Sequence, residues 1–365
     1  MSVFDRAAAH IRSISPYQPG KPISELAREM GLEESSIVKL ASNENPLGMS
    51  PHARAAALAA IDEVPRYPDG NGFELKQALM RHHDIGMDQI VLGNGSNDVL
   101  EMVARALLGP GCSAVYSKHA FAVYPLATLA AGAFGIEVPA RNFGCDPDAM
   151  RDAIRDDTRV VFIANPNNPT GTFVEAAALE RFVASVPADV LVVLDEAYSE
   201  YLPAHLAYDS ARWLARYPNL LVSRTFSKAY GLGGLRVGYG IGQPPVIDLL
   251  NRVRQPFNVS NVGLAAAAAA LADQDFVRAS AAANAAGLRQ LEAFFDAQDI
   301  EYIRSCANFI AFRAGDAARI NRRLLEQGVI VRPVAGYAMP EWLRVSIGLE
   351  SENARFIDAL TRART

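Results

Sequence analysis

The middle of the chain alternates short apolar runs with longer segments of helical periodicity. The apolar runs occupy residues 113–117, 159–164, 190–194, 219–223 and 236–241. Short runs rich in β-branched residues predict strands that are buried on both faces, as in parallel sheets. Helical patterns such as EAAALERFVASV at 175–186 lie between several of these runs. The segment from about 87 to 245 therefore predicts an α/β fold, with helices on both faces of a mostly parallel sheet.

The pattern changes after Pro256. A long helical stretch is followed by shorter strands and helices, at about 275–298, 300–312, 315–327, 329–332, 343–347 and 350–362. This order of elements predicts a second, smaller α/β domain. We therefore expect an N-terminal arm with part of the small domain at 1–45, a large domain at 46–255 and a small C-terminal domain at 256–365.

Composition and charge narrow the class of protein. The chain has 365 residues, of which 50% are hydrophobic, with a net charge of −5 and a pI of about 5.8. This balance does not suggest a nucleic-acid or anionic-membrane partner. The longest apolar run, at 262–272, is too short to span a bilayer. The three cysteines form no motif, the six histidines show no metal-ligand spacing and the first residues are unlike a secretory signal. We expect a cytoplasmic protein without a metal site.

The stretch SRTFSKAYGLGGLRVGY at 223–239 contains the most informative residue, Lys228. A lysine among small hydroxyl residues and glycines suits a buried amine that bonds covalently to a carbonyl. Thr225 and Arg236 would supply donors for a phosphate close to that amine. An amine with a phosphate cradle is what a pyridoxal phosphate Schiff base requires. The alternative for an isolated Ser-Lys pair is a solvated lysine in a glycine-rich loop.

Two further polar segments follow predicted strands. Asp195 ends the run VLVVLD, and ligands of open α/β sheets bind at that edge. A carboxylate there could pair with a protonated pyridine nitrogen, and Tyr198 could reach the ring's phenolic oxygen. Asn168, in NPNNPTG, also follows an apolar run and precedes a proline that keeps it extended. The simpler interpretations are a helix N-cap for Asp195 and a turn for Asn168.

The segment GNGSND at 93–98 precedes the helical pattern VLEMVARAL. Glycines that lead into a helix expose backbone N–H groups to an anion. An ordinary loop with a serine N-cap would have the same pattern.

In this order, the segments resemble the fold-type I pyridoxal phosphate aminotransferases and, more narrowly, the histidinol-phosphate aminotransferase family. The resemblance also rests on PYQPGKP at 16–22, KLASNENPLG at 39–48, RYPDGNG at 66–72, VRP at 331–333 and LRVSIG at 343–348. One position departs from the family pattern. Two acidic residues usually follow GNGS, whereas this chain has Asn97 and Asp98. The departure leaves open an altered substrate preference.

The resemblance implies a role for each matching residue. Lys228 forms the Schiff base with pyridoxal phosphate and shuttles the proton, Asp195 binds the ring nitrogen, and Asn168 and Tyr198 bind the phenolic oxygen. The remaining cofactor-binding residues are Phe121, stacked on the ring, and Gly95, Ser96, Asn97, Thr225, Ser227 and Arg236 around the phosphate. Tyr67 is expected to reach the cofactor of the other subunit, which implies a homodimer with shared sites.

Substrate choice is expected to rest on Tyr17, Asn168, Arg332 and Arg344. Arginine offers fork-shaped donors to either a carboxylate or a phosphate. Two arginines can therefore accept glutamate and histidinol phosphate in alternate half-reactions. The predicted reaction converts histidinol phosphate and 2-oxoglutarate to imidazole-acetol phosphate and glutamate, in histidine biosynthesis. The alternative within the class is an aminotransferase for phenylalanine or tyrosine.

More distant alternatives fit the sequence less well. A threonine-phosphate decarboxylase would use the same cofactor. A pyridoxal phosphate-binding transcription regulator would need a DNA-binding domain, but only about 40 residues, which are not basic, precede NENPLG. A nicotinamide dehydrogenase would need a glycine where GLGGLRVGYG has Arg236.

Overall fold

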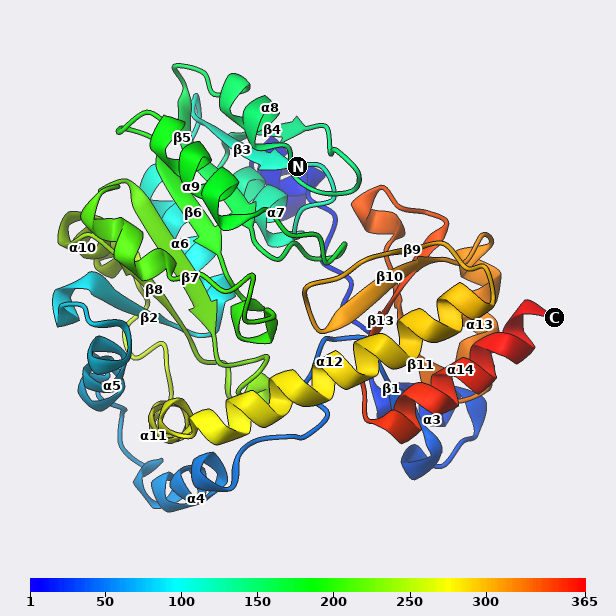
Figure 1. Cartoon of the computed structure of the whole chain (residues 1–365). Coiled ribbons are helices and arrows are strands. Elements are labelled where there is room, and N and C mark those ends of the chain that lie inside the picture. The colour runs from blue at the N-terminus through cyan, green and yellow to red at the C-terminus, as the bar shows by residue number, and fades with distance from the viewer.

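The structure, a computed structural model, describes residues 1–365 and contains one large, mostly parallel sheet. Its seven strands lie in the order β2-β8-β7-β6-β5-β3-β4 (Figure 1). Their bounds are β2 Ile90–Gly93, β3 Ser113–Ser117, β4 Phe134–Val138, β5 Thr158–Ala164, β6 Leu191–Asp195, β7 Leu220–Thr225 and β8 Gly238–Gly242. Only β8 runs antiparallel to its neighbours β7 and β2. The predicted fold class is confirmed.

Helices cover both faces of this sheet. One face packs on α6 (Ser96–Leu107), α7 (Val123–Ala130) and α10 (Pro244–Val253). The other packs on α4 (Pro51–Ala60), α5 (Phe73–His83), α8 (Pro147–Asp152), α9 (Ala176–Ser185) and α11 (Asn261–Ala272). Successive strand residues alternate between the two cores: Val160 and Phe162 belong to the first, and Val161 and Ile163 to the second. This alternation explains why the buried strands read as continuous apolar runs.

A smaller group of elements forms a second layer. Four strands pair antiparallel in the order β12-β13-β10-β9, with bounds β9 Tyr302–Ile303, β10 Phe309–Arg313, β12 Arg332–Pro333 and β13 Trp342–Ser346. A parallel pair joins β1 (Val38–Lys39) to β11 (Val329–Ile330). Helices α3 (Ile23–Met30), α13 (Ala317–Glu326) and α14 (Glu350–Arg364) pack beside them. The long helix α12 (Gln274–Ala297) runs from α11 to this layer (Figure 1).

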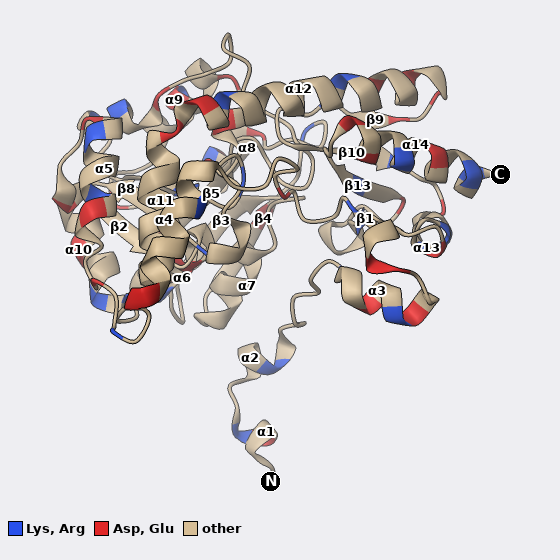
Figure 2. Ribbon diagram, turned by 90° about the horizontal axis from the view of Figure 1, so that it is seen from below, with Lys and Arg blue, Asp and Glu red and all other residues tan.

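The N-terminal segment lies apart from α3 and contacts the large domain at α7. It carries two short helices, α1 (Val3–Arg6) and α2 (Ala9–Ser13), which extend away from α3 (Figure 2). The chain returns through β1, which pairs with β11. None of the helices combines the length and apolar character needed to cross a bilayer.

Short 3₁₀ helices complete the connections. They are η1 Glu34–Ser36, η2 Ile61–Glu63, η3 Met87–Gln89, η4 Ser199–Tyr201, η5 Ser210–Ala215, η6 Gly233–Leu235 and η7 Ala335–Tyr337.

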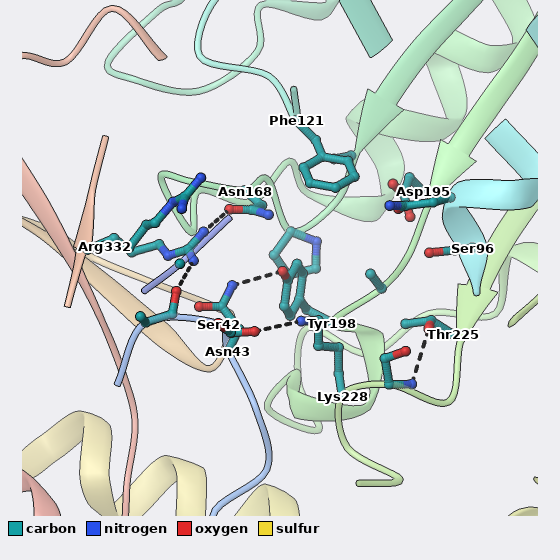
Figure 3. A pocket seen from close by; sticks show the side chains of 18 of the residues that line it. Ser42, Asn43, Ser96, Phe121, Asn168, Asp195, Tyr198, Thr225, Lys228 and Arg332 are labelled. Atoms are coloured by element: carbon teal, nitrogen blue, oxygen red, sulfur yellow. Dashed lines mark hydrogen bonds between the residues drawn. The ribbon is translucent and has the colours of Figure 1, made fainter. Parts of the chain in front are cut away.

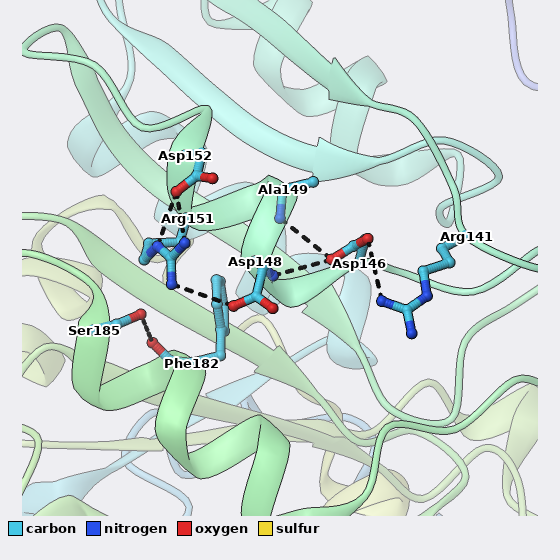
Figure 4. A network of polar contacts seen from close by, with 8 residues as sticks. All are labelled: Arg141, Asp146, Asp148, Ala149, Arg151, Asp152, Phe182 and Ser185. Atoms are coloured by element: carbon cyan, nitrogen blue, oxygen red, sulfur yellow. Dashed lines mark hydrogen bonds and ion pairs between the residues drawn. The ribbon is translucent and has the colours of Figure 1, made fainter.

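A network of polar contacts fixes the loop that leads into α8. Asp146 caps the helix by accepting from the backbone N–H groups of Asp148 and Ala149, at 3.1 and 3.3 Å (Figure 4). Arg151 pairs with Asp148 at 3.2 Å. Exposed ion pairs of this kind contribute little stability, so this network has a local structural role.

Candidate active site

The candidate site is a cavity of about 180 Å³ between the large sheet and the smaller layer. Asp195 and Thr225, at the carboxyl ends of β6 and β7, line it (Figure 3). All but two of the predicted site residues meet there: Tyr17, Ser96, Asn97, Phe121, Asn168, Asp195, Tyr198, Thr225, Ser227, Lys228, Arg236, Arg332 and Arg344. The two that do not line it are Gly95 and Tyr67. Residues from the arm, the large sheet and the smaller layer therefore share one space.

The amine of Lys228 lies at this cavity, just beyond β7. Its Nζ donates to the backbone oxygen of Ser42 at 3.0 Å and lies 5.8 Å from the ring centroid of Tyr198. Burial, and next the positive charge of Arg344, lower the pKa of Lys228 to about 7. Much of the amine is therefore neutral near pH 7, as a nucleophile that attacks a carbonyl must be.

The carboxyl group of Asp195 is buried, with only 5% of the residue exposed. Burial raises its pKa to about 6, and a hydrogen bond from Tyr124 works in the opposite direction. Its Oδ2 accepts from the Tyr124 hydroxyl at 2.9 Å, while Oδ1 has no hydrogen-bond partner within the protein. A buried carboxylate oxygen without a partner is costly, so this group fits a cationic ligand.

A phosphate cradle lies at the start of α6. Gly95, with φ at +80°, turns the chain so that the helix begins at Ser96. The positive φ at Gly95 favours glycine, and a Cβ atom there would lie 2.4 Å from the Arg236 guanidinium, which would have to move. Arg236 donates to Ser227 Oγ at 3.1 Å, and the Ser227 N–H donates to Thr225 Oγ1 at 3.1 Å. A helix N-terminus, hydroxyls and a guanidinium together form an anion site.

The other side of the cavity is lined by amides and a phenol. The Tyr198 hydroxyl accepts from Asn43 Nδ2 at 3.0 Å. Arg344 donates to Asn168 Oδ1 and, at 2.8 Å, to the Ala41 backbone oxygen. The guanidinium of Arg344 is buried, and its Nε has no partner. The predicted residues Asn168 and Arg344 are thus joined by a hydrogen bond, while Tyr198 is held by Asn43.

The two predicted substrate arginines are direct neighbours. Arg332 on β12 and Arg344 on β13 are paired across the antiparallel ladder. Like charges at opposed positions repel each other, and Arg332 contributes to lowering the pKa of Arg344, after burial as the larger cause. Arg332 also donates to the Gln18 backbone oxygen and lies 5.4 Å from the Tyr17 ring centroid. Paired arginines in a cavity favour the binding of anions.

A second, larger cavity of about 650 Å³ adjoins the first. The two share Tyr17, Gly20, Arg332 and Tyr337. Apolar groups, including those of Pro125, Leu126 and Val331, make up much of its wall, and Glu137 and His119 also line it. The arrangement gives space for a substrate side chain beyond the lysine.

The remaining predicted residues lie outside the cavity. Gly95 does not line the cavity but contacts the guanidinium of Arg236, which does. Tyr67 is 83% exposed and stacks on Phe257 at 4.8 Å. Asp98, at the departure from the family pattern, accepts from the Asn94 N–H at 2.9 Å and from Asn258 Nδ2 at 2.7 Å. Asp98 therefore fixes the loop, while Asn97 alone of the pair lines the cavity.

Sequence reasoning missed four residues at this site. Ser42 and Asn43 contact Lys228 and Tyr198, and they lie in KLASNENPLG, a motif noted only for its resemblance. Tyr124 and Tyr337 had no comparable signal. Tyr124 lies three residues after Phe121, which is the only hint that the sequence offers.

This residue set fits pyridoxal phosphate. It provides a nucleophilic amine, a buried carboxylate oxygen without a partner, a phosphate cradle and an aromatic side chain at Phe121. The fold and the site together define a fold-type I aminotransferase that uses this cofactor.

Comparison with known proteins gives the family. The chain belongs to the aminotransferase class I and II family, whose model matches residues 35–360. It is 62% identical to histidinol-phosphate aminotransferase 2 of Nitrosospira multiformis over 100% of this chain and 93% of the relative. It is 64% identical to histidinol-phosphate aminotransferase 1 of Thiobacillus denitrificans over 97% of this chain and 92% of the relative.

A solved structure extends the likeness to three dimensions. The structure of histidinol-phosphate aminotransferase from Sinorhizobium meliloti, in complex with pyridoxal 5′-phosphate, superposes with a TM-score of 0.91. It is 29% identical and the match covers 100% of this chain and 98% of that one.

Proposed function

We propose that this protein is a histidinol-phosphate transaminase. It interconverts histidinol phosphate and 2-oxoglutarate with imidazole-acetol phosphate and glutamate, in histidine biosynthesis. The observation that carries the proposal is the cross-strand pair Arg332 and Arg344 in the same cavity as Lys228. Repulsion within such a pair is relieved by anionic substrates, and both half-reactions bring them.

Lys228 is proposed to act first as nucleophile and then as proton carrier. Pyridoxal phosphate, when bound, supplies a carbonyl for the amine and a cationic ring that takes up electrons from the substrate α-carbon. The neutral fraction of Lys228 near pH 7 suits it to remove the proton from that carbon and return it to the cofactor's C4′. The Ser42 backbone oxygen holds the amine in the cavity beforehand.

Asp195 and Tyr198 are proposed to hold the cofactor ring from two sides. The free Oδ1 of Asp195 would accept from the ring N–H and keep the ring cationic. Tyr198, with Asn168, would donate to the phenolic oxygen. Burial raises the pKa of Tyr198 to about 12, so its hydroxyl stays protonated and can donate.

The two arginines are proposed to divide the charges of the substrate. Arg344, which is buried beside Asn168, would bind the α-carboxylate of glutamate. Arg332, at the boundary with the larger cavity, would bind the distal carboxylate or phosphate with Tyr17. One site could then serve both amino donors.

An aromatic aminotransferase remains the second candidate. The larger cavity beside Arg332 has apolar walls that could hold a phenyl or phenol ring. Phenylalanine would leave Arg332 without an anion, which makes this candidate less favourable.

We also propose that the enzyme is a cytoplasmic homodimer with shared sites. Exposed apolar side chains recur along α4, η2, the loop that follows and the start of α5: Leu58, Ile61, Val64, Tyr67 and Phe73. Exposed apolar side chains that recur along one stretch of the chain suit a protein interface. Tyr67 would thereby reach the cofactor phosphate of the neighbouring subunit. Three free cysteines support a reducing compartment.

The half-reaction tests this function directly. Holoenzyme mixed with histidinol phosphate alone should lose the visible absorbance of the lysine-bound cofactor, and 2-oxoglutarate should restore it. Phenylalanine at the same concentration is the comparison. If histidinol phosphate leaves the spectrum unchanged while other amino donors bleach it, the proposed substrate is wrong.

A further inference from the structure

Tyr124 is a fully buried tyrosine on α7, beside the cavity but not lining it. Its ring stacks on Phe162 at 4.9 Å with an angle of 5° between the planes. Its hydroxyl has one protein acceptor, Oδ2 of Asp195, at 2.9 Å. A buried phenol with one charged acceptor in a binding site is more specific than core packing requires, because a phenylalanine would fill the same space.

The hydrogen bond from Tyr124 occupies one of the two carboxylate oxygens of Asp195. With Oδ2 bound to Tyr124, Oδ1 is left without a protein partner in the cavity that Asp195 lines. Tyr124 therefore selects the oxygen that remains for a ligand.

Tyr124 also contacts Phe121, the aromatic side chain expected to stack on the cofactor ring. Its ring meets Phe121 edge to face, with centroids 5.9 Å apart and an angle of 86°. Edge-to-face pairs have a preferred geometry, so Tyr124 restricts the tilt of Phe121. One side chain thus contacts both the residue assigned to the ring nitrogen and the residue assigned to the face of the ring.

We propose that Tyr124 is a positioning residue, which keeps Asp195 ionised and oriented toward the ring nitrogen and seats Phe121 against the ring. This rests on the proposed use of the cofactor. The alternative is a core tyrosine whose hydroxyl merely takes the nearest acceptor.

The surroundings of Asp195 determine how its pKa should change when the Tyr124 hydroxyl is removed. Burial raises the pKa of Asp195 and the hydrogen bond from Tyr124 lowers it. Neighbouring Glu196 raises it, while the backbone N–H of Ala197 and the charge of Lys228 lower it. A hydrogen bond to the charged form stabilises that form. Removing the phenol hydroxyl should therefore raise the pKa of Asp195, by about one to two pH units for a charge-assisted bond.

The test compares Tyr124→Phe with Tyr239→Phe. Tyr239 is an equally buried tyrosine of the large-sheet core whose hydroxyl bonds instead to His83 at 3.0 Å. The Asp195 carboxyl is titrated in the apoenzyme by ¹³C NMR, with Asp195→Asn identifying its signal. The dissociation constant of pyridoxal phosphate is then measured for each variant between pH 6 and 9.

Tyr124→Phe should raise the apoenzyme titration midpoint by about one to two units and weaken cofactor binding roughly tenfold or more. Tyr239→Phe should leave both unchanged. The proposal is overturned if the midpoint stays fixed, if cofactor affinity stays within about twofold, or if both variants behave alike. The carboxyl titration needs no cofactor, so failure of wild-type protein to bind pyridoxal phosphate would instead reject the proposed function.

Discussion

At the scale of single residues, burial sets the chemistry of the site. The pKa of Lys228 is lowered to about 7 and that of Asp195 is raised to about 6, in both cases mainly by burial. An amine and a carboxyl that titrate near neutral pH, in one cavity, are typical of functional sites.

The amine's pKa predicts how the apoenzyme takes up its cofactor. Because the folded pKa is below that of a free lysine, the amine is protonated and inert below pH 7 and reactive above it. The rate at which the visible band forms on adding pyridoxal phosphate should therefore rise with pH through about 7 and then level off. Arg344→Gln removes a charge that lowers this pKa, so its midpoint should lie higher. A wild-type rate that keeps rising to about pH 10, as for a solvated lysine, would contradict the account.

The arginine pair predicts a pattern among substrates. For any substrate with a distal anion, Arg332→Ala should remove about 1.5–3 kcal/mol of transition-state stabilisation. This corresponds to a fall of roughly ten- to a hundredfold in kcat/KM. The kcat/KM should fall for histidinol phosphate and for glutamate, and should change little for phenylalanine. Steady-state kinetics with the three donors decide this. Equal losses for all three would show that Arg332 supports the structure rather than the distal anion.

Residue types were predictable at this scale, but their partners were not. Lys228, Asp195 and Asn168 stand in motifs or at strand ends that point to their chemistry. The bond between Tyr124 and Asp195 joins residues 71 positions apart, on α7 and β6. Only tertiary packing brings these residues together, and no periodicity reports it.

At the scale of elements, the carboxyl ends of the strands place the site. The apolar runs predicted β3, β5, β6, β7 and β8, and the structure confirms each of them. The runs missed β2 and β4; β4 is mostly exposed and reads FGIEV. Strand propensity is weak where one edge of the sheet faces solvent.

The close approach of β8 to the start of α6 gives a prediction for this scale. A Cβ atom at Gly238 would lie 2.3 Å from the Ser96 backbone nitrogen, so Gly238→Ala must displace the phosphate cradle at the start of α6. It should cost about 1–3 kcal/mol of stability and weaken cofactor binding. Gly234→Ala, where no atom lies within 4 Å of the added methyl group, is the matched control. Thermal unfolding and cofactor titration measure both effects; if both alanine variants bind cofactor as the wild type does, the loop does not depend on this contact.

The division into domains stays a prediction at the same scale. Helix α11 follows the expected boundary at residue 256, yet its alanines pack in the core of the large sheet together with α4. We propose that the division falls within α12, whose ends lie in different parts of the molecule (Figure 1).

At the scale of the whole molecule, the proposed sharing of sites between two subunits can be tested with mixed variants. Lys228→Ala subunits should be inactive, and Tyr67→Phe subunits should bind cofactor about 1.5–3 kcal/mol more weakly. A mixed dimer would hold one site with Lys228 from one chain and Tyr67 from the other. Mixing the variants should therefore give more activity at limiting cofactor than the mean of the parents. Activity equal to that mean would place Tyr67 in its own chain's site.

The proposal that the cavity binds the anionic groups of glutamate and histidinol phosphate in turn can be checked on the unmutated enzyme. With 2-oxoglutarate as acceptor, kcat/KM is measured for histidinol phosphate, phenylalanine and tyrosine. The kcat/KM for histidinol phosphate should exceed both others by at least the contribution of one charge-assisted contact, roughly tenfold or more. A higher kcat/KM for phenylalanine or tyrosine would contradict the proposal and assign the larger cavity to an aromatic ring.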